Sequence, residues 1–150
     1  MASSAMIAFV LFAAGGQDKA RTITFAKTDL DKPPTGWTVA QTNKGENSSV
    51  WKVVADASTP SKSGFAVAQT ASSPSAVFNL CVANDTSFKD VEVHVSFKAI
   101  AGKKDQGGGI VWRYQDENNY YVARMNPLED NYRFYKVIGG KRIQIGRAHV

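Results

Sequence analysis

The sequence predicts an all-β domain, a sandwich or a barrel, and three observations support this fold class. Residues 91–98 alternate without a break between apolar and polar side chains, which is typical of an antiparallel strand with one buried face. Other short runs rich in β-forming residues are separated by clusters of Gly, Pro, Asn, Asp and Ser. Almost no segment repeats its apolar residues at helical spacing over ten positions.

The expected strands and turns follow in order along the chain. The strand at 91–98 directs Val91, Val93, Val95 and Phe97 to one face. The other β-rich runs lie at residues 23–25, 37–39, 50–54, 65–70, 76–82, 109–114, 120–126 and 132–137. Turn-forming residues lie at 32–36, 43–47, 59–61, 72–74, 115–119 and 138–141. Short strands with turns at this spacing indicate a sandwich or barrel.

Two connections have a specific backbone chemistry. Residues 107–109 are three glycines, which allow a strand to begin in a tight or bulged geometry or let another segment approach closely. Asp116, Asn118 and Asn119 suit a turn that tolerates left-handed backbone angles. A purely structural role in turns and bulges explains all of these residues.

Composition limits the class of protein. The 150 residues are 43% apolar with a single cysteine, which fits one domain with a packed core and excludes an internal disulfide or a thiolate-based zinc site. The net charge of +5 is spread along the chain, and 103–104 and 141–142 are the only adjacent basic pairs. Nucleic-acid binding normally needs basic residues concentrated on one face, so we expect no nucleic-acid partner.

The first sixteen residues have the pattern of a signal peptide. They carry no charged side chain, residues 5–14 are a continuous apolar stretch, and Ala14, Gly15 and Gly16 supply a cleavage site before Gln17. The stretch is too short to span a bilayer. We expect a secreted or periplasmic protein with no membrane contact after leader cleavage. The alternative is a buried N-terminal strand or helix, because the usual basic residue of a leader is missing.

The last six residues, 145–150, look like the translation of a sequencing-library adapter. We therefore expect a non-native tail, a domain at residues 17–144, and a native protein that continues beyond about Gln144. Without Arg147 the charge is 17 − 13 = +4, and His149 drops out of any catalytic proposal.

The run GGGIVWRYQDENNYYVAR at residues 107–124 shows a family resemblance. It resembles the strand-turn-strand hairpin of concanavalin A-like lectin/glucanase domains of laminin-G type. Segments 36–37, 86–90, 128–131 and 135–137 are similar to secreted bacterial members near the 3-keto-disaccharide hydrolases and family-16 glycoside hydrolases. Over residues 25–143, the resemblance implies an antiparallel two-sheet jelly-roll sandwich, incomplete at its C-terminus. This superfamily includes lectins, enzymes and adhesion modules.

Side-chain parity suggests a ligand-binding face. If the strands at 109–114, 120–126 and 131–137 are neighbours in register, Arg113, Arg124 and Arg133 line one face, with Asn126 and Tyr135 between them. Aromatic faces and planar donors are what a sugar site needs. The alternative is a solvated outer face with incidental arginines.

The three tryptophans have different expected roles. Parity puts Trp112 on the opposite face from Arg113, together with Ile110 and Tyr114. Trp112 is the best ligand candidate, with core packing as its alternative. Trp51 is flanked by apolar residues and is expected in the core, whereas Trp37 follows a Pro-rich turn and suits a sheet edge.

No catalytic residue can be assigned. The Glu-x-Asp-x-x-Glu motif of family-16 enzymes is absent, and the acidic pairs at 116–117 and 129–130 lie in turns. His94 has no Ser-His-Asp or metal-ligand spacing around it. We expect no cofactor. A structural calcium ion stays unassigned, because the loop aspartates Asp85, Asp90, Asp105, Asp116 and Asp130 lack calcium-loop spacing.

Two functions from different classes follow. The first is a non-catalytic carbohydrate-binding module of an exported protein, with a polysaccharide or oligosaccharide as its partner. The second is a glycan-processing hydrolase or lyase of the 3-keto-disaccharide hydrolase or glucanase type. A structural repeat of a surface protein is a third possibility, but the sequence contains no internal repeat.

Overall fold

The computed structural model describes residues 5–12, 21–44, 49–103 and 105–149. Over these residues the chain is built of antiparallel strands, with one short 3-10 helix at Lys27–Asp29 and no α-helix. The all-β sandwich prediction is confirmed. No helix in the described segments has the length and apolar character needed to cross a membrane.

The first sheet, here called the N-terminal sheet, is organised around β1. Its neighbour β7 pairs with β1 along the whole length of β1, and the other edge of β1 is shared by β5 and β2. Strand β4 completes the sheet by pairing with β5. The strands are β1 (Ala5–Phe12), β2 (Arg21–Ile23), β4 (Trp51–Ala55), β5 (Phe65–Gln69) and β7 (Glu92–Ala99).

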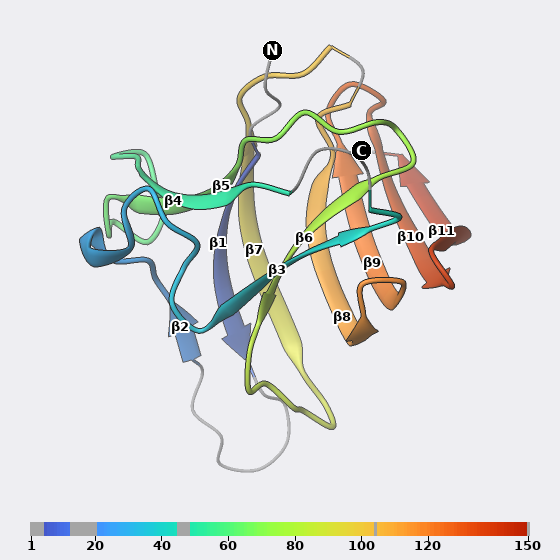
Figure 1. Ribbon diagram of the computed structural model, residues 1–150, viewed down its shortest axis with the longest axis horizontal. Helices are drawn as coiled ribbons and strands as arrows, with labels where there is room; N and C mark the ends of the chain where they lie inside the picture. The colour runs from blue at the N-terminus through green and yellow to red at the C-terminus, as the bar shows by residue number, and fades with distance from the viewer. Residues whose placement is uncertain (1–4, 13–20, 45–48, 104, 150) are drawn as a thin grey trace.

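The second sheet, here called the C-terminal sheet, is a four-stranded meander in the order β11-β10-β9-β8. Its last turn is formed by Gly139 and Gly140, whose φ angles of 54° and 77° are those of a two-residue type I′ hairpin. The strands are β8 (Gly108–Asp116), β9 (Asn119–Asn126), β10 (Asn131–Ile138) and β11 (Lys141–His149). Strands β7 and β8 lie side by side but are not paired (Figure 1).

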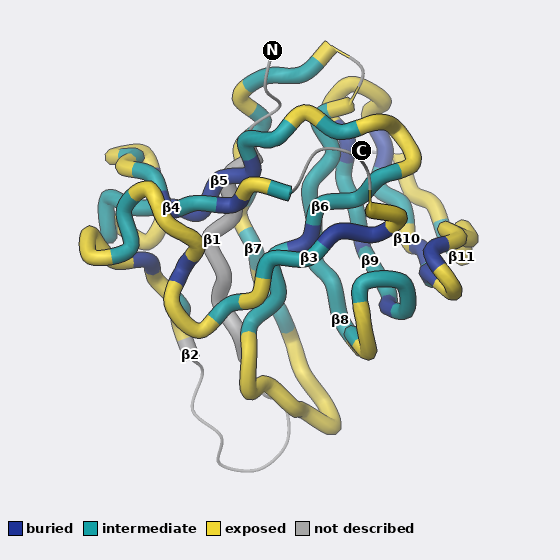
Figure 2. Tube along the Cα trace, in the orientation of Figure 1, coloured by how far each residue is buried: buried dark blue, intermediate teal, exposed yellow. Residues whose placement is uncertain are grey.

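A two-stranded ribbon, β3 (Trp37–Thr42) and β6 (Phe78–Ala83), crosses in front of the two sheets (Figure 1). Alternate residues of the ribbon point to opposite faces. The face with Val39 and Cys81 packs on a core of the N-terminal sheet. The face with Ala40 and Leu80 packs on a core of the C-terminal sheet. The ribbon therefore packs apolar residues on both faces, and Figure 2 shows its buried residues at the end of β3 and in the middle of β6.

Most expected strands are present within a few residues of their predicted bounds. Strand β7 alternates between half-buried and exposed side chains as predicted. The close approach expected at the glycines is also present, since a Cβ on Gly108 would meet the Phe97 ring and one on Gly109 would meet the backbone of Ala123. Asp116 to Asn119 instead form their turn without left-handed angles, because the Asp116 carboxylate accepts hydrogen bonds from the Asn118 amide and the Asn119 side chain.

Both chain ends contain strands: the N-terminal one was the stated alternative to a signal peptide, and the C-terminal one was not predicted from the sequence. Residues 5–12, assigned above to a signal peptide, form β1 within the N-terminal sheet. Residues 145–149, assigned to a non-native tail, extend β11 opposite β10. Residues 1–4, 13–16, 45–47 and 150, which also belong to predicted segments, lie outside the described residues. Leader cleavage and the origin of the tail stay predictions.

The ribbon predicts where the fold is most sensitive to side-chain truncation. Leu80 is 5% exposed in the core that joins β6 to the C-terminal sheet. We expect Leu80→Ala to lower the free energy of unfolding by about 2–4 kcal/mol, because it leaves a cavity there. Urea denaturation followed by circular dichroism measures this change. Ile100→Ala is the control, because Ile100 is 52% exposed and should cost less than about 0.5 kcal/mol. Equal losses in both variants would contradict the packing described here.

Candidate functional site

The predicted arginine face forms in part. Strands β8, β9 and β10 are neighbours, and Arg124 lies directly opposite Arg133 in the β9–β10 ladder. Asn126 pairs with Asn131 and Val122 with Tyr135, so these side chains share one face. Val122 belongs to the core under the ribbon. The face is therefore the inner surface of the C-terminal sheet and not a solvated outer face.

Arg113 does not lie on this face, which corrects the parity prediction. The β8–β9 register shifts between Trp112 and Asp116, and Arg113 has a φ of 49°. This β-bulge reverses the facing of the residues that follow it. The Arg113 guanidinium lies 5.9 Å from the centre of the Tyr121 ring on the outer face. Tyr114, predicted to share a face with Trp112, instead packs in the inner core 6.3 Å from Tyr120.

Carboxylates neutralise the two arginines of the inner face. Arg124 Nη2 lies 2.5 Å from Asp105 Oδ1, and Arg133 Nη2 lies 3.4 Å from Glu129 Oε2. The Asn131 side chain donates a hydrogen bond to Glu129, and this bond, together with the charges of Arg124 and Arg133, holds the pKa of Glu129 below its ordinary value. Two cations therefore face two anions in a closed cluster that ties the loops around residues 105 and 129 to the sheet.

Asn126 has a structural contact that the sequence did not reveal. Its side-chain oxygen accepts hydrogen bonds from the backbone amides of Gln106 and Leu128. The residue is fully buried and holds the β9–β10 turn. Its Nδ2 atom, and Oδ1 of Asn131 on the facing strand, have no hydrogen-bond partner. Asn126 therefore has a structural role in this turn whether or not a ligand is present.

Tyr135 contacts two arginines, Arg133 through its hydroxyl and Arg142 through its ring. It is 4% exposed, and its hydroxyl accepts a 3.4 Å hydrogen bond from Arg133. The Arg142 guanidinium lies 4.6 Å from the centre of the Tyr135 ring and 4.4 Å from the centre of the Phe78 ring. The sequence pattern missed Arg142 because no strand was predicted after residue 137. Counting across the two-glycine turn would have placed it opposite Val137, which is where it lies.

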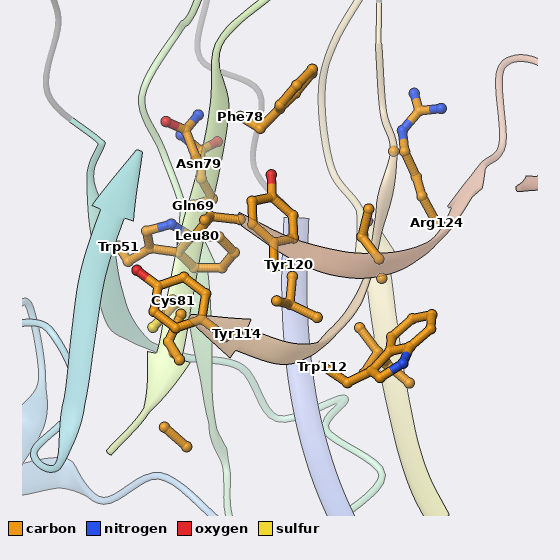
Figure 3. A pocket seen from close by; sticks show the side chains of 18 of the residues that line it. Trp51, Gln69, Phe78, Asn79, Leu80, Cys81, Trp112, Tyr114, Tyr120 and Arg124 are labelled. Carbon is orange, nitrogen blue, oxygen red and sulfur yellow. The ribbon is translucent and has the colours of Figure 1, made fainter. Parts of the chain in front are cut away.

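A cavity of about 1460 Å³ lies between the ribbon and the two sheets. Its lining is mixed, with aromatic rings, side-chain amides and charged groups (Figure 3). Three of the predicted ligand-binding residues, Trp112, Arg113 and Arg124, line it, whereas Asn126, Arg133 and Tyr135 do not. The lining residues that the prediction missed include Trp51, Gln69, Phe78, Asn79, Tyr120 and Arg142.

Trp51 is a core residue that also lines the cavity. It packs in the core of the N-terminal sheet, as predicted, and is 6% exposed. Its indole nitrogen has no hydrogen-bond partner and the residue lines the cavity. An unpaired buried donor costs about 1–3 kcal/mol, which the packing of the indole ring in this core offsets. In the sequence, only the presence of a tryptophan at this position could have pointed to a role of Trp51 in a binding site.

The amides of the cavity are held in fixed orientations. The Asn79 side chain accepts a hydrogen bond from Gln41 at 2.9 Å and donates one to Ser73 at 3.0 Å. Gln69 donates to the carbonyl of Ala71 at 2.9 Å. Trp112 is stacked on Tyr121 with ring centres 5.8 Å apart, at the β8 side of the cavity. The wall is therefore organised before any ligand enters.

The described residues offer little for catalysis or metal binding. No three His, Cys, Asp or Glu side chains among them gather as metal ligands. Burial raises the pKa of the Cys81 thiol to about 12, so it is protonated near neutral pH and is a poor nucleophile. His94 is exposed, and its Nε2 atom lies 2.7 Å from Glu92 Oε1. Asp116 accepts hydrogen bonds from Asn119 and Asn118, which lower its pKa and assign it to the turn.

Comparison with known proteins adds nothing to this geometry: no family model, no curated protein and no solved structure matches the chain.

The Glu129 cluster predicts a specific acid sensitivity. A carboxyl whose pKa is lowered in the fold stabilises the protein above its ordinary pKa of 4.5 and loses that contribution as the pH falls through the folded value. We expect the melting temperature to fall more steeply below about pH 4.5 in the wild type than in Glu129→Gln. Thermal unfolding from pH 7 to pH 3 measures this. Parallel profiles would contradict the cluster.

Proposed function

We propose that the chain is a carbohydrate-binding β-sandwich module that holds an oligosaccharide, or a stretch of a polysaccharide, in the cavity beside the ribbon. The observation that carries this proposal is the cavity wall on which the Trp51 ring lies with other aromatic rings and with the oriented amides of Gln69 and Asn79. Membership of the concanavalin A-like, laminin-G-type group and export from a bacterial cell belong to the same proposal. The two-sheet antiparallel architecture supports the first of these and the charge-free start supports the second.

The lining suits a polyhydroxylated ligand. Sugar rings present C–H faces that stack on aromatic side chains, and hydroxyls that both donate and accept hydrogen bonds. Trp51, Tyr114 and Tyr120 supply aromatic surface, and Figure 3 shows their rings around one space. Gln69 and Asn79 supply polar groups. Of the predicted residues, Trp112 and Arg124 are retained in the proposed site.

Size favours an oligosaccharide over a single sugar. Small-molecule pockets usually measure about 300–1,000 Å³, and this cavity is larger at about 1460 Å³. It runs from the arginine of β9 to the start of β6, which are the positions of Arg124 and Phe78 in Figure 3. Several linked rings can therefore contact the wall at the same time.

The electrostatics favour binding over glycan processing. A glycosidase needs a carboxylic acid that keeps its proton near neutral pH, which requires a raised pKa. The pKa of Glu129 is lowered, first by the Asn131 hydrogen bond. Asp105, which lines the cavity, is ion-paired with Arg124. Glu129 is therefore not suited to donate a proton to a leaving group.

Calorimetric titration tests the proposal. The 150-residue chain is titrated with β-glucan and other oligosaccharides while release of reducing sugar is followed. We expect saturable binding without release of sugar. Trp51→Phe reduces the aromatic surface of the cavity wall, and it should weaken binding about fivefold, which corresponds to the loss of about 1 kcal/mol of aromatic contact. Tyr132→Phe, on the opposite face of β10, is the control and should bind as the wild type does.

Two results would count against the proposal. Absence of binding to every saccharide would overturn the carbohydrate-binding function. Release of reducing sugar by the wild type would replace it with the glycan-processing alternative. Equal affinities of wild type and Trp51→Phe, with both folded by circular dichroism, would place the ligand elsewhere than in this cavity.

A further inference from the structure

Arg142 is held at the cavity by contacts with two other strands. It lies on β11 directly opposite Val137, so its side chain points to the inner face of the C-terminal sheet. Its guanidinium lies over the rings of Phe78 from β6 and Tyr135 from β10. The Asn43 side chain fixes these elements relative to each other, because it donates one hydrogen bond to the Ala76 carbonyl and another to the Gly140 carbonyl.

The charge of Arg142 is not neutralised by the protein. Arg124 and Arg133 both form ion pairs, with Asp105 and Glu129. Within the part of the chain that the structure describes, no carboxylate forms an ion pair with Arg142. The guanidinium carbon lies over two aromatic rings, which do not neutralise its charge as a carboxylate would. The N–H groups at the edge of the guanidinium are thus available for an external acceptor.

The cavity has a small excess of positive charge. Apart from Arg113, which points to the outer face, four of its described lining residues are basic and three are acidic: Lys89, Lys103, Arg124 and Arg142 against Asp85, Asp90 and Asp105. A concave surface with an excess of one sign attracts ligands of the other sign. Among these basic residues, Arg142 is the one whose guanidinium lies over two aromatic rings.

A second polar group lies near Arg142. The Thr42 hydroxyl donates its single hydrogen to the Glu117 carbonyl at 2.6 Å. Its 2.8 Å contact with the Tyr120 hydroxyl must then have Tyr120 as the donor. The Tyr120 oxygen keeps its lone pairs for an incoming donor. Burial raises the pKa of Tyr120, while Thr42 and the positive charge of Arg142 act in the opposite direction, so this group is neutral near pH 7.

We propose that Arg142 is the receptor for a negatively charged substituent of the bound sugar, either the carboxylate of a uronic acid or a sulfate ester. The inference rests on the carbohydrate-binding function proposed above and names the ligand class. Carboxylate and sulfate oxygens match the fork of a guanidinium and form charge-assisted hydrogen bonds with it. The Tyr120 oxygen accepts a hydrogen bond from a hydroxyl of the same sugar ring.

Three oligosaccharides of equal length test this inference by calorimetry: a neutral gluco-oligosaccharide, an oligouronate and a sulfated oligosaccharide. We expect the wild type to bind at least one of the charged probes about tenfold or more tightly than the neutral probe at low salt, as charge-assisted hydrogen bonds require. If the oligouronate binds more strongly, the group that Arg142 binds is a carboxylate. If the sulfated probe binds more strongly, the group is a sulfate ester. Equal affinity for all three probes would overturn the inference.

Variants locate the effect. Arg142→Gln should reduce affinity for the charged probe about tenfold and leave affinity for the neutral probe within about twofold. Arg142→Lys keeps the charge but loses the planar fork, so it should retain only part of the preference. Lys141→Gln removes the same charge from the neighbouring residue, which lies outside the cavity lining, and should behave as the wild type. If Lys141→Gln lost the preference for the charged probe as strongly as Arg142→Gln does, the preference would come from the overall charge of the protein. That result would contradict a site at Arg142.

The outcomes separate this inference from the function it depends on. If no probe binds the wild type, the carbohydrate-binding proposal itself fails. If the neutral probe binds as tightly as the charged probes, carbohydrate binding stands and the role of Arg142 is wrong. The preference of the wild type among the three probes needs no variant, so the inference is tested even if Arg142→Gln does not fold.

Discussion

The fold depends on the burial of both faces of the β3–β6 ribbon. A strand pair usually buries one face and leaves the other to solvent, but here Val39 and Cys81 pack on one sheet while Ala40 and Leu80 pack on the other. The polar residues of the ribbon are accommodated by hydrogen bonds. Gln41 is 6% exposed and bonds to Asn79, and Thr42 is fully buried and bonds to Glu117 and Tyr120. The ribbon therefore sets the separation of the sheets and, with it, the cavity.

The bulge in β8 determines what the cavity presents. A regular strand would have kept Tyr114 on the side of Trp112 and Arg113 on the side of Val111. Since the register shifts after Trp112, Tyr114 turns inward beside Tyr120, and Arg113 turns outward over Tyr121. One backbone irregularity thus exchanges an arginine for an aromatic ring on the inner wall. The left-handed φ of Arg113 is a strained conformation, and such strain is concentrated at functional sites in many proteins.

Charge pairing divides the arginines of the inner face into two groups. Arg124 and Arg133 face Asp105 and Glu129, and their role in holding loops is sufficient to explain them. The Arg142 guanidinium lies over two aromatic rings, which orient it without neutralising it, and no carboxylate among the described residues forms an ion pair with it. Contact with aromatic rings leaves the positive charge of a guanidinium in place, whereas an ion pair with a carboxylate neutralises it. This difference makes Arg142, rather than the predicted Arg133, the centre of the proposed recognition.

The sequence by itself determined the local features of the protein. Alternation located β7, turn chemistry separated most of the strands, and parity correctly put Arg124 and Arg133 on one face, because these properties depend on neighbouring residues alone. Tertiary structure decided the bulge at Arg113, the carboxylate partners of the arginines and the position of Trp51 on a cavity wall. It also brought Phe78, Tyr135 and Arg142 together from three strands. These features depend on how distant segments pack, and no local pattern of side chains encodes the separation of two sheets or the ion that faces a given charge.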